Sequence, residues 1–363
     1  MKVLMFSLDP KMADSGSTVR ARHREYAKHI AELSVIVLAN TEKEERIVEG
    51  NLVLYTPGKG SKGSIKTWGE FLGNAVAEQY AKEGGGVVTS PDPFLVGYLA
   101  WKIARRYRLP LHLQLHTDIF HPRFRAESWR NRLYFLLAWF LLKRAQGIRV
   151  VARGIQEQLT SRWGVPPERI MVLPVFVDTE HLAETQPAFS LQDKYPQLEK
   201  IVLVVSRLTP EKRVDLAIKV FAEIRKTFPR AGLVVVGDGP ALSTLQLLST
   251  SYHLQDSVIF AGWQNDVLSY YKGVDALLVT SLYEGYGMQI VEALASGCPV
   301  VSTDVGVATE AGATVARDEQ QLPEVLAKIL REGKRGELRA SFRMNKQAYT
   351  AQYIQSLAQT CNA

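Results

Sequence analysis

The feature that most constrains the fold is an alternation of short apolar runs with longer amphipathic stretches, which occurs twice. Apolar runs at 35–39, 87–90 and 111–115 alternate with stretches of helical character in the first half. This pattern is typical of parallel strands connected by helices. The alternation pauses over 178–196 and restarts with the run IVLVVS at 201–206. The sequence therefore predicts an α/β protein with two similar doubly wound domains.

The length of 363 residues is sufficient for two domains of ordinary size. We expect a first Rossmann-like domain over residues 1–185 and a second over 186–340. The remaining segment, 341–363, is predicted to be a helix that packs back on the first domain. No metal-binding D-x-D triplet occurs, and we expect neither an obligatory metal ion nor a cofactor.

Positive charge is concentrated in the first half, since residues 101–150 contain 11 Lys and Arg against 2 Asp and Glu. Such a region is expected to meet an anionic surface or acceptor. Within it, the apolar segment LYFLLAWFLL at 133–142 has basic residues on both sides. Ten residues are too few to span a bilayer. The segment is either a buried helix or a helix that lies on an anionic membrane surface.

The two cysteines do not suggest a disulfide framework, and residues 1–8 are too short for a signal peptide. We therefore expect a cytoplasmic protein, with peripheral association at the inner membrane face as an open alternative.

Two carboxylates, Glu284 and Glu292, bracket the segment EGYGMQIVE after an apolar run at 276–280. In parallel sheets, ligands bind beyond the carboxyl ends of the strands. Gly285 and Gly287 allow backbone N–H groups to approach a ligand, and a helix N-terminus favours negative charge. Carboxylates accept hydrogen bonds from sugar hydroxyls. The segment predicts a nucleotide-sugar site, unless the two carboxylates only cap the helix or lie in solvent.

The loop SRLTPEKR places Arg207 and Lys212 just beyond the strand at 201–206. A guanidinium and an ammonium there are suited to a diphosphate. In the first domain, Gly16 follows the first strand, and His116 ends the strand at 111–115. Both lie where a ligand would bind, although a lone glycine and a lone histidine are often structural.

Taken together, the motifs SRLTPEK, VVVGDGP, VIFAGW and EGYGMQIVEALASGCPVVST resemble the retaining family 4 glycosyltransferases. The resemblance is specific over residues 200–305 and general over the first half. It implies the GT-B fold, with two facing Rossmann-like domains and a cleft between them. It also implies transfer of a hexosyl group from a nucleotide-diphosphate sugar to a glycan or lipid-linked acceptor, with retained anomeric configuration and without a metal.

By this resemblance, Arg207 and Lys212 would stabilise the leaving diphosphate, Glu284 would contact the transferred sugar, and Glu292 would bind the ribose. Backbone N–H groups near the sugar and phosphate would come from Gly285, Tyr286 and Gly287. Gly16 would lie near the donor phosphate and His116 near the sugar. The chain differs from the family pattern where Ser17 follows Gly16 in place of a second glycine.

Two other functions fit the same fold. A sugar-nucleotide epimerase would need a pair of general acid–base groups, and a phosphorylase would need a cofactor lysine, and neither is evident in the sequence. A non-catalytic subunit that binds nucleotide sugars would have no use for all four of Arg207, Lys212, Glu284 and Glu292. The residues leave the donor sugar, its base and the acceptor open.

Overall fold

The computed structural model describes residues 1–362 of the chain. The chain divides into two compact units, which the sequence had placed at 1–185 and 186–340. The first unit comprises Met1–Pro174 and the segment from Gln347 onward, and the second comprises Val175–Lys346. The chain therefore leaves the first unit once and returns to it near its end.

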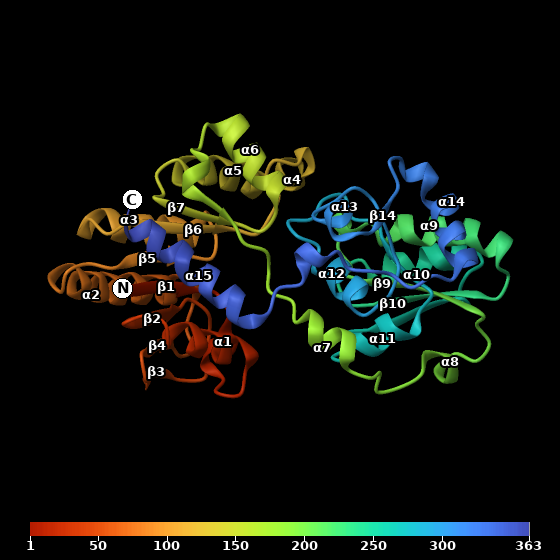
Figure 1. Cartoon of the computed structure of the whole chain (residues 1–363), viewed down its shortest axis with the longest axis horizontal. Coiled ribbons are helices and arrows are strands. Elements are labelled where there is room, and N and C mark those ends of the chain that lie inside the picture. Colours follow the sequence, from red (N-terminus) through yellow and green to blue (C-terminus); the bar gives the residue numbers. More distant parts are fainter. Residues whose placement is uncertain (363) are drawn as a thin grey trace. The chain divides into compact units, whose positions relative to one another are not determined.

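An eight-stranded sheet forms the centre of the first unit, in the order β3-β4-β2-β1-β5-β6-β7-β8 (Figure 1). All neighbouring strands are parallel except β3, which pairs antiparallel with β4 at one edge. The central strands are buried and mostly apolar, as expected for strands covered on both faces. The strands are β1 Lys2–Ser7, β2 Glu32–Val37, β3 Glu44–Glu49, β4 Leu52–Pro57, β5 Val87–Ser90, β6 Leu111–Leu115, β7 Gly147–Val150 and β8 Ile170–Val172.

Helices connect these strands, and several begin at a serine whose hydroxyl accepts a backbone N–H, as Ser17, Ser61 and Ser128 do. The helix α2 and the β3–β4 hairpin were not expected from the sequence. The helices are α1 Thr18–Ala27, α2 Lys62–Lys82, α3 Leu95–Tyr107, α4 Pro122–Glu127, α5 Trp129–Leu142, α6 Arg153–Trp163 and α15 Lys346–Cys361, with 3-10 turns η1 Pro10–Ala13 and η2 Pro167–Arg169.

The C-terminal helix α15 is joined to the first unit's sheet by a buried polar layer. Arg149 on β7 donates to the Tyr349 hydroxyl at 2.7 Å, to Gln114 Oε1 at 2.7 Å, and to the carbonyls of Leu173 and Pro174 at 3.1 and 2.7 Å. The amide of Gln114 also lies 3.3 Å from the Tyr353 hydroxyl. These bonds satisfy a buried cation without a carboxylate, so α15 is an integral part of this unit.

His112 on β6 belongs to the same layer. Its Nδ1 lies 2.9 Å from Thr89 Oγ1 and its Nε2 lies 2.9 Å from Ser356 Oγ on α15. Burial lowers the pKa of His112 to about 3, and the positive charge of Arg149 acts in the same direction. Burial likewise lowers the pKa of His23 on α1 to about 4. Both rings are therefore neutral at pH 7.

This burial predicts loss of stability in mild acid. In the unfolded chain both histidines take up protons near pH 6.5, whereas in the folded unit they do so only near pH 3–4. Their contribution is complete above the unfolded pKa and declines as the pH falls below it, by about 2 kcal/mol per histidine at about pH 5. Urea unfolding at pH 7 and at about pH 5 should show a smaller loss of unfolding free energy for His112→Gln than for the wild type. An equal loss of unfolding free energy in the variant and the wild type would contradict the role given to His112.

A six-stranded parallel sheet forms the centre of the second unit, in the order β11-β10-β9-β12-β13-β14. This is the strand order of a dinucleotide-binding Rossmann sheet. Its core packs the sheet against α9 and α14, through residues such as Ile218, Phe221 and Leu326. The strands are β9 Lys200–Val205, β10 Ala231–Val236, β11 Val258–Gly262, β12 Ala276–Val279, β13 Val300–Ser302 and β14 Thr314–Val315.

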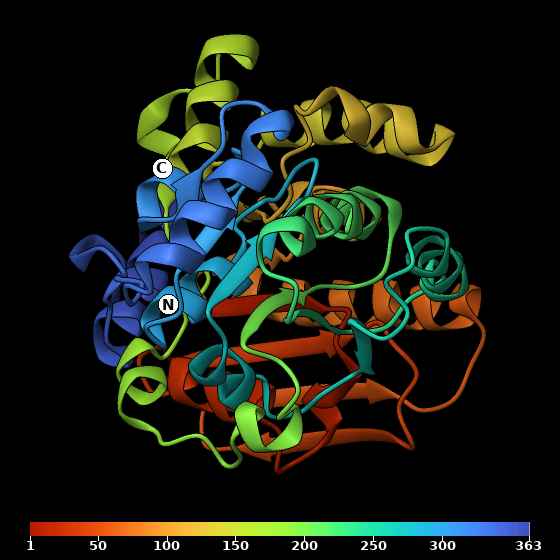
Figure 2. The same cartoon turned by 90° about the vertical axis from the view of Figure 1, so that its right-hand side faces the viewer.

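The helices of the second unit lie on both sides of this sheet (Figures 1 and 2). The helices are α7 Thr179–Glu184, α8 Leu191–Lys194, α9 Val214–Thr227, α10 Leu242–Ser251, α11 Val267–Gly273, α12 Met288–Ala295, α13 Ala308–Ala311 and α14 Leu322–Glu332, with 3-10 turns η3 Pro210–Lys212, η4 Glu319–Gln321 and η5 Ala340–Phe342. Among residues 1–362, none of the helices has the length and hydrophobicity needed to cross a bilayer.

Candidate functional site

The candidate site of the second unit lies at the carboxyl edge of its sheet. The chain runs from β9 outward through β10 to β11 and then returns to β12 on the other side of β9. Loops that follow β9 and β12 therefore diverge at this point, which is where open α/β sheets bind ligands. The loop after β9 is SRLTPEKR, and the loop after β12 contains EGYG.

Lys212 and Glu284 meet at this edge. Lys212 Nζ lies 2.6 Å from Glu284 Oε1, and the two side chains are only 14% and 10% exposed. The same carboxylate oxygen accepts hydrogen bonds from Ser281 Oγ at 2.8 Å and from Gln289 Nε2 at 3.0 Å. Several donors thus hold one carboxylate in a single orientation, next to the cation predicted to bind a diphosphate.

Hydrogen bonds to backbone carbonyls hold the two loops together. The Thr280 hydroxyl, at the end of β12, donates to the carbonyls of Lys212 and Arg213 at 3.1 and 2.8 Å. The amide of Leu282 donates to the Glu211 carbonyl at 2.8 Å. The loop positions are therefore set by main-chain contacts, and the Lys212–Glu284 pair does not depend on long flexible side chains alone.

The second carboxylate, Glu292, lies on α12. Its Oε2 accepts a hydrogen bond from the Tyr271 hydroxyl of α11 at 3.1 Å. Burial raises the pKa of Glu292, and the bond from Tyr271 opposes this only in part. Burial also raises the pKa of Tyr271 well above its usual value, so the phenol remains a donor. Glu292 is not a solvent-exposed side chain, in contrast to one of the alternatives considered from the sequence.

The turn between β12 and α12 requires glycine. Gly287 has φ +89° and forms the N-cap of α12, while Gly285 is half-buried directly after Glu284. Tyr286 is buried, and its carbonyl accepts the Val307 amide at 2.9 Å. At Gly306, with φ +54°, a Cβ would collide with that same carbonyl. Gly306 was not singled out in the sequence, although DVGVAT follows a buried strand as the other site loops do.

Arg207 has a different partner from Lys212. It is 71% exposed and bonds Glu211 Oε1 at 3.3 Å, so the structure pairs the two predicted cations with different carboxylates. Its neighbour Ser206 was not predicted to be functional. The Ser206 hydroxyl is buried and has no hydrogen-bond partner among the described residues, which makes it a further candidate for ligand contact.

The two predicted site residues of the first unit also lie at a carboxyl edge. Gly16 is exposed in the loop after β1, where its amide donates to Asp14 Oδ1 at 2.9 Å. His116 follows β6, with Nε2 3.3 Å from Gln114 Oε1. Desolvation lowers the pKa of His116, and Arg149 and Arg22 lower it further. The residue as a whole is exposed.

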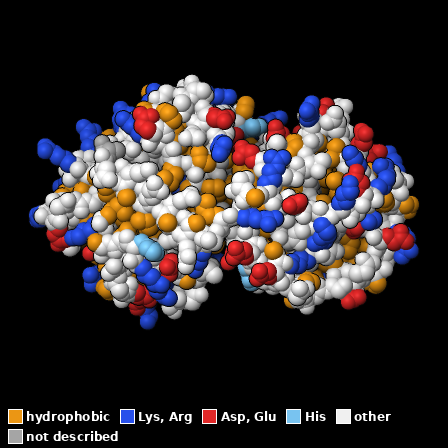
Figure 3. All heavy atoms as spheres, viewed as in Figure 1, with side chains coloured by type: hydrophobic (Ala, Val, Ile, Leu, Met, Phe, Trp, Pro, Cys, Tyr) orange, Lys and Arg blue, Asp and Glu red, His pale blue; other side chains and the backbone are white. Residues whose placement is uncertain are grey.

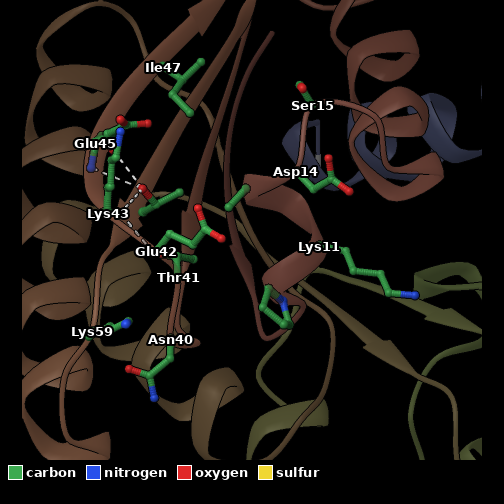
Figure 4. Close-up of a pocket in the computed structure, with 13 residues that line it drawn as sticks. Lys11, Asp14, Ser15, Asn40, Thr41, Glu42, Lys43, Glu45, Ile47 and Lys59 are labelled. Atoms are coloured by element: carbon green, nitrogen blue, oxygen red, sulfur yellow. Dashed lines mark hydrogen bonds between the residues drawn. The ribbon is translucent and has the colours of Figure 1, made fainter.

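A pocket of about 740 Å³ opens beside Gly16 in the first unit. Figure 4 shows side chains of the loop after β1 on one side and of the loop after β2 and the β3–β4 hairpin on the other. The lining combines hydroxyl, amide and charged groups of both signs: Lys11, Asp14, Ser15, Asn40, Thr41, Glu42, Lys43, Glu45 and Lys59. Such a lining is suited to a polar ligand with many hydroxyl groups.

Both units match family models. Residues 190–348 match the model described as Glycosyl transferases group 1, and residues 18–181 match the model described as Glycosyltransferase Family 4. The chain belongs to glycosyltransferase family 4. The resemblance to family 4 inferred from the motifs of the second half of the chain is thereby confirmed. The more general resemblance of the first half is confirmed as well.

Two curated relatives illustrate the family's range. The alpha-monoglucosyldiacylglycerol synthase of Streptococcus pneumoniae is 29% identical over 242 residues, covering 62% of this chain and 53% of the relative. The N-acetyl-alpha-D-glucosaminyl L-malate synthase of Bacillus anthracis is 33% identical over 143 residues, covering 39% of this chain and 37% of the relative. The matched part is thus about half the length of these relatives or less.

Among solved structures, Anabaena HepE in complex with UDP has a TM-score of 0.69 and 18% sequence identity, covering 99% of this chain and 100% of that one. Sucrose-phosphate synthase from Thermosynechococcus elongatus also has a TM-score of 0.69, covering 99% and 96%. These likenesses confirm the predicted GT-B fold class of this family 4 glycosyltransferase.

Proposed function

We propose that this family 4 protein is a retaining hexosyltransferase that uses a nucleotide-diphosphate sugar and a glycan or lipid-linked acceptor. The observation that carries the proposal is the Lys212 Nζ–Glu284 Oε1 contact of 2.6 Å at the sheet edge. The Lys212 ammonium is suited to phosphate, and the Glu284 carboxylate is suited to sugar hydroxyls. In a nucleotide-diphosphate sugar the phosphate and the sugar are directly linked, so neighbouring groups of these two kinds can bind both.

The remaining donor contacts follow from the positions of the residues. Lys212, aided by the exposed Arg207, is proposed to neutralise the diphosphate, while Glu284 accepts hydrogen bonds from the sugar. Glu292, with its Tyr271 bond, is proposed to accept the ribose hydroxyls. Backbone N–H groups of the turn from Gly285 through Tyr286 to Gly287 complete the set, and the orphaned Ser206 hydroxyl is an additional donor.

The proposed reaction breaks the bond between the anomeric carbon and the leaving diphosphate oxygen. The acceptor oxygen bonds to the same carbon on the same face, and its proton passes to the leaving diphosphate. Negative charge grows on the leaving oxygen, and fixed cations at that position stabilise the transition state. We propose that Lys212 and Arg207 perform this role without a metal ion. His116, neutral and at its own sheet edge, is proposed to bond a sugar hydroxyl, and Gly16 to lie near phosphate.

The acceptor is proposed to bind in the first unit, in the 740 Å³ pocket with its mixed polar lining. A diacylglycerol-based product named for the S. pneumoniae relative supports a lipid-linked acceptor. Cys298 and Cys361 are free thiols, which accords with the reducing cytoplasm as the site of the reaction.

The proposal predicts opposite effects of Glu292→Gln on donor binding and on stability. The folded unit raises the pKa of Glu292, so ionisation opposes folding, and stability falls as the pH rises through the unfolded pKa. The neutral amide keeps an acceptor for Tyr271 and should raise the melting temperature at pH 7. Loss of a charged acceptor for the ribose should weaken nucleoside-diphosphate binding about 10- to 100-fold. Calorimetric titration and thermal melting would measure both, and unchanged affinity would remove Glu292 from the donor site.

Donor class and reaction can be established in two steps. Thermal melting with UDP, GDP and ADP should identify one diphosphate that stabilises the protein most, because ligands of the folded state raise its stability. The matching sugar nucleotide is then incubated with candidate acceptors, and the product is examined by NMR. A new glycosidic bond with retained configuration supports the proposal. A changed sugar without transfer would indicate an epimerase. Glycosyl transfer to or from inorganic phosphate would indicate a phosphorylase, and tight binding without turnover would indicate a non-catalytic subunit.

A further inference from the structure

The helix α5 presents an apolar stripe to solvent. Trp129, Leu133 and Leu136 are 70%, 53% and 60% exposed, and at 100° per residue they fall on one side of the helix. The opposite side, with Ala138, is buried in the first unit. Of the two alternatives for this segment, a buried helix therefore describes only one side of α5. α5 is the gold helix at the upper right of Figure 2.

Basic residues border the stripe on both sides. On the helical projection, Arg132 and Lys143 fall on one flank, and Arg130 and Arg144 on the other. Aromatic rings of the same helix lie under three of these cations: Lys143 is 5.2 Å from the Trp139 ring, Arg144 3.7 Å from Phe140 and Arg130 5.8 Å from Tyr134. In these three residues the side chain packs on an aromatic ring beside the stripe, and the charged group remains in solvent.

The four residues Arg130, Arg132, Lys143 and Arg144, here called the collar, lie in a segment that is poor in carboxylates. Between residues 122 and 144 the sequence has six Lys and Arg and a single acidic residue, Glu127. Across residues 1–362, Arg130, Arg132, Lys143 and Arg144 form no ion pair. Figure 3 shows hydrophobic, basic and some acidic side chains over the upper border of the first unit.

An arginine-lined pocket of about 690 Å³ lies at the C-terminal end of α5, with Arg105, Arg108 and Arg144 in its lining. The stripe continues toward it, because the Phe140 ring packs on Trp101 of α3 at 5.1 Å, and Arg105 lies 5.4 Å from the same Trp101 ring. Three guanidinium groups around one depression are suited to phosphate oxygens.

We propose that the α5 surface, defined here as Trp129, Leu133, Leu136 and their basic neighbours, docks on a bilayer of anionic phospholipids. The apolar stripe enters the interface between headgroups and acyl chains, the collar meets the anionic surface, and the arginine pocket accepts lipid phosphate. The charge of the collar favours this occupant, since a helical face made for a protein partner is depleted of charge at its centre and need not be cationic on both flanks. The inference goes beyond the proposed reaction and does not depend on it.

Vesicle sedimentation tests the proposal with the full-length protein. Binding to vesicles of equal parts phosphatidylcholine and phosphatidylglycerol should exceed binding to pure phosphatidylcholine by at least about tenfold at low salt, and should weaken at high salt. The double variant Leu133→Glu, Leu136→Glu should lose at least about tenfold of this binding. A charge variant, Arg130→Gln with Arg132→Gln, should lose the preference for the anionic vesicles.

Leu247→Glu is the matched control, because Leu247 is a 73% exposed leucine of the second unit, and its binding should equal that of the wild type. Equal binding of all variants, or no binding to the anionic vesicles, would overturn the proposal. So would an oligomer in analytical ultracentrifugation that dissociates in the double variant, since the stripe would then be a contact between copies. Stabilisation by nucleoside diphosphates, measured in parallel, reports on the donor site and separates failure of this inference from failure of the proposed reaction.

Discussion

Replacement of Lys212 by alanine is expected to lower kcat for glycosyl transfer about 100- to 1000-fold, the usual cost of removing a group that stabilises transition-state charge. Lys212 Nζ is fixed 2.6 Å from Glu284 Oε1 and is only slightly exposed, so water cannot fully replace it. Initial rates at saturating donor and acceptor would measure the loss. Because the effect is on the transition state, kcat should fall more than the affinity for the nucleoside diphosphate.

The variant must be shown to fold. Glu284 keeps hydrogen bonds from Ser281 and Gln289, so its carboxylate is not left without donors, and the second unit should retain a cooperative melting transition. Lys219→Ala is the matched control, because Lys219 is exposed on α9 and pairs with Asp215; its rate should equal that of the wild type. A folded Lys212→Ala protein with undiminished kcat would contradict the role given to this lysine.

Replacement of Arg149 by leucine is expected to destabilise the first unit by about 2–4 kcal/mol, because a buried polar group that loses its hydrogen-bond partner costs about 1–3 kcal/mol. The guanidinium bonds the Gln114 amide, the Tyr349 hydroxyl and the carbonyls of Leu173 and Pro174. Leucine would remove one donor from each of these acceptors. Urea unfolding followed by circular dichroism would measure the change.

Arg153→Leu provides the comparison, since Arg153 is exposed at the start of the neighbouring helix α6 and should change stability by no more than about 0.5 kcal/mol. If the two arginine variants unfold at the same urea concentration, the bonds of Arg149 do not stabilise the first unit as described.

The sheets could be predicted because their central strands are nearly continuous apolar runs, such as IVLVVS at the start of the second unit. Elements whose sequence lacks that signal were missed. The edge strand Glu44–Glu49 is largely polar and exposed, and the strand is recognisable only through its pairing with β4. The helix Lys62–Lys82 begins in a segment rich in glycine, lysine and serine, and this composition is typical of a loop.

The candidate site was predictable to the level of loops but not of contacts. Both Lys212 and Glu284 follow apolar strands, which places them at the carboxyl edge of a sheet. Their pairing across 72 positions depends on β12 lying next to β9, and the strand order is not encoded in either motif alone. The exposure of Arg207 and the orphaned Ser206 hydroxyl depend on side-chain packing that no spacing reveals.

The exposed stripe of α5 illustrates the same limit. The segment LYFLLAWFLL is apolar on nearly all sides, so its periodicity does not indicate which side faces the sheet. Burial of Ala138, Leu141 and Leu142 selects that side, and only then do Leu133 and Leu136 become outward residues.

The return of the chain through α15 has a consequence for biosynthesis. A ribosome that has delivered Met1–Pro174 has not yet delivered Gln347 and the residues after it, which belong to the same unit. The second unit is continuous from Val175 to Lys346, so all its residues are synthesised before α15 is complete. It can therefore fold before the first unit has its last helix. A truncated N-terminal fragment is therefore expected to require added α15 peptide for solubility, whereas the insert is suited to separate expression.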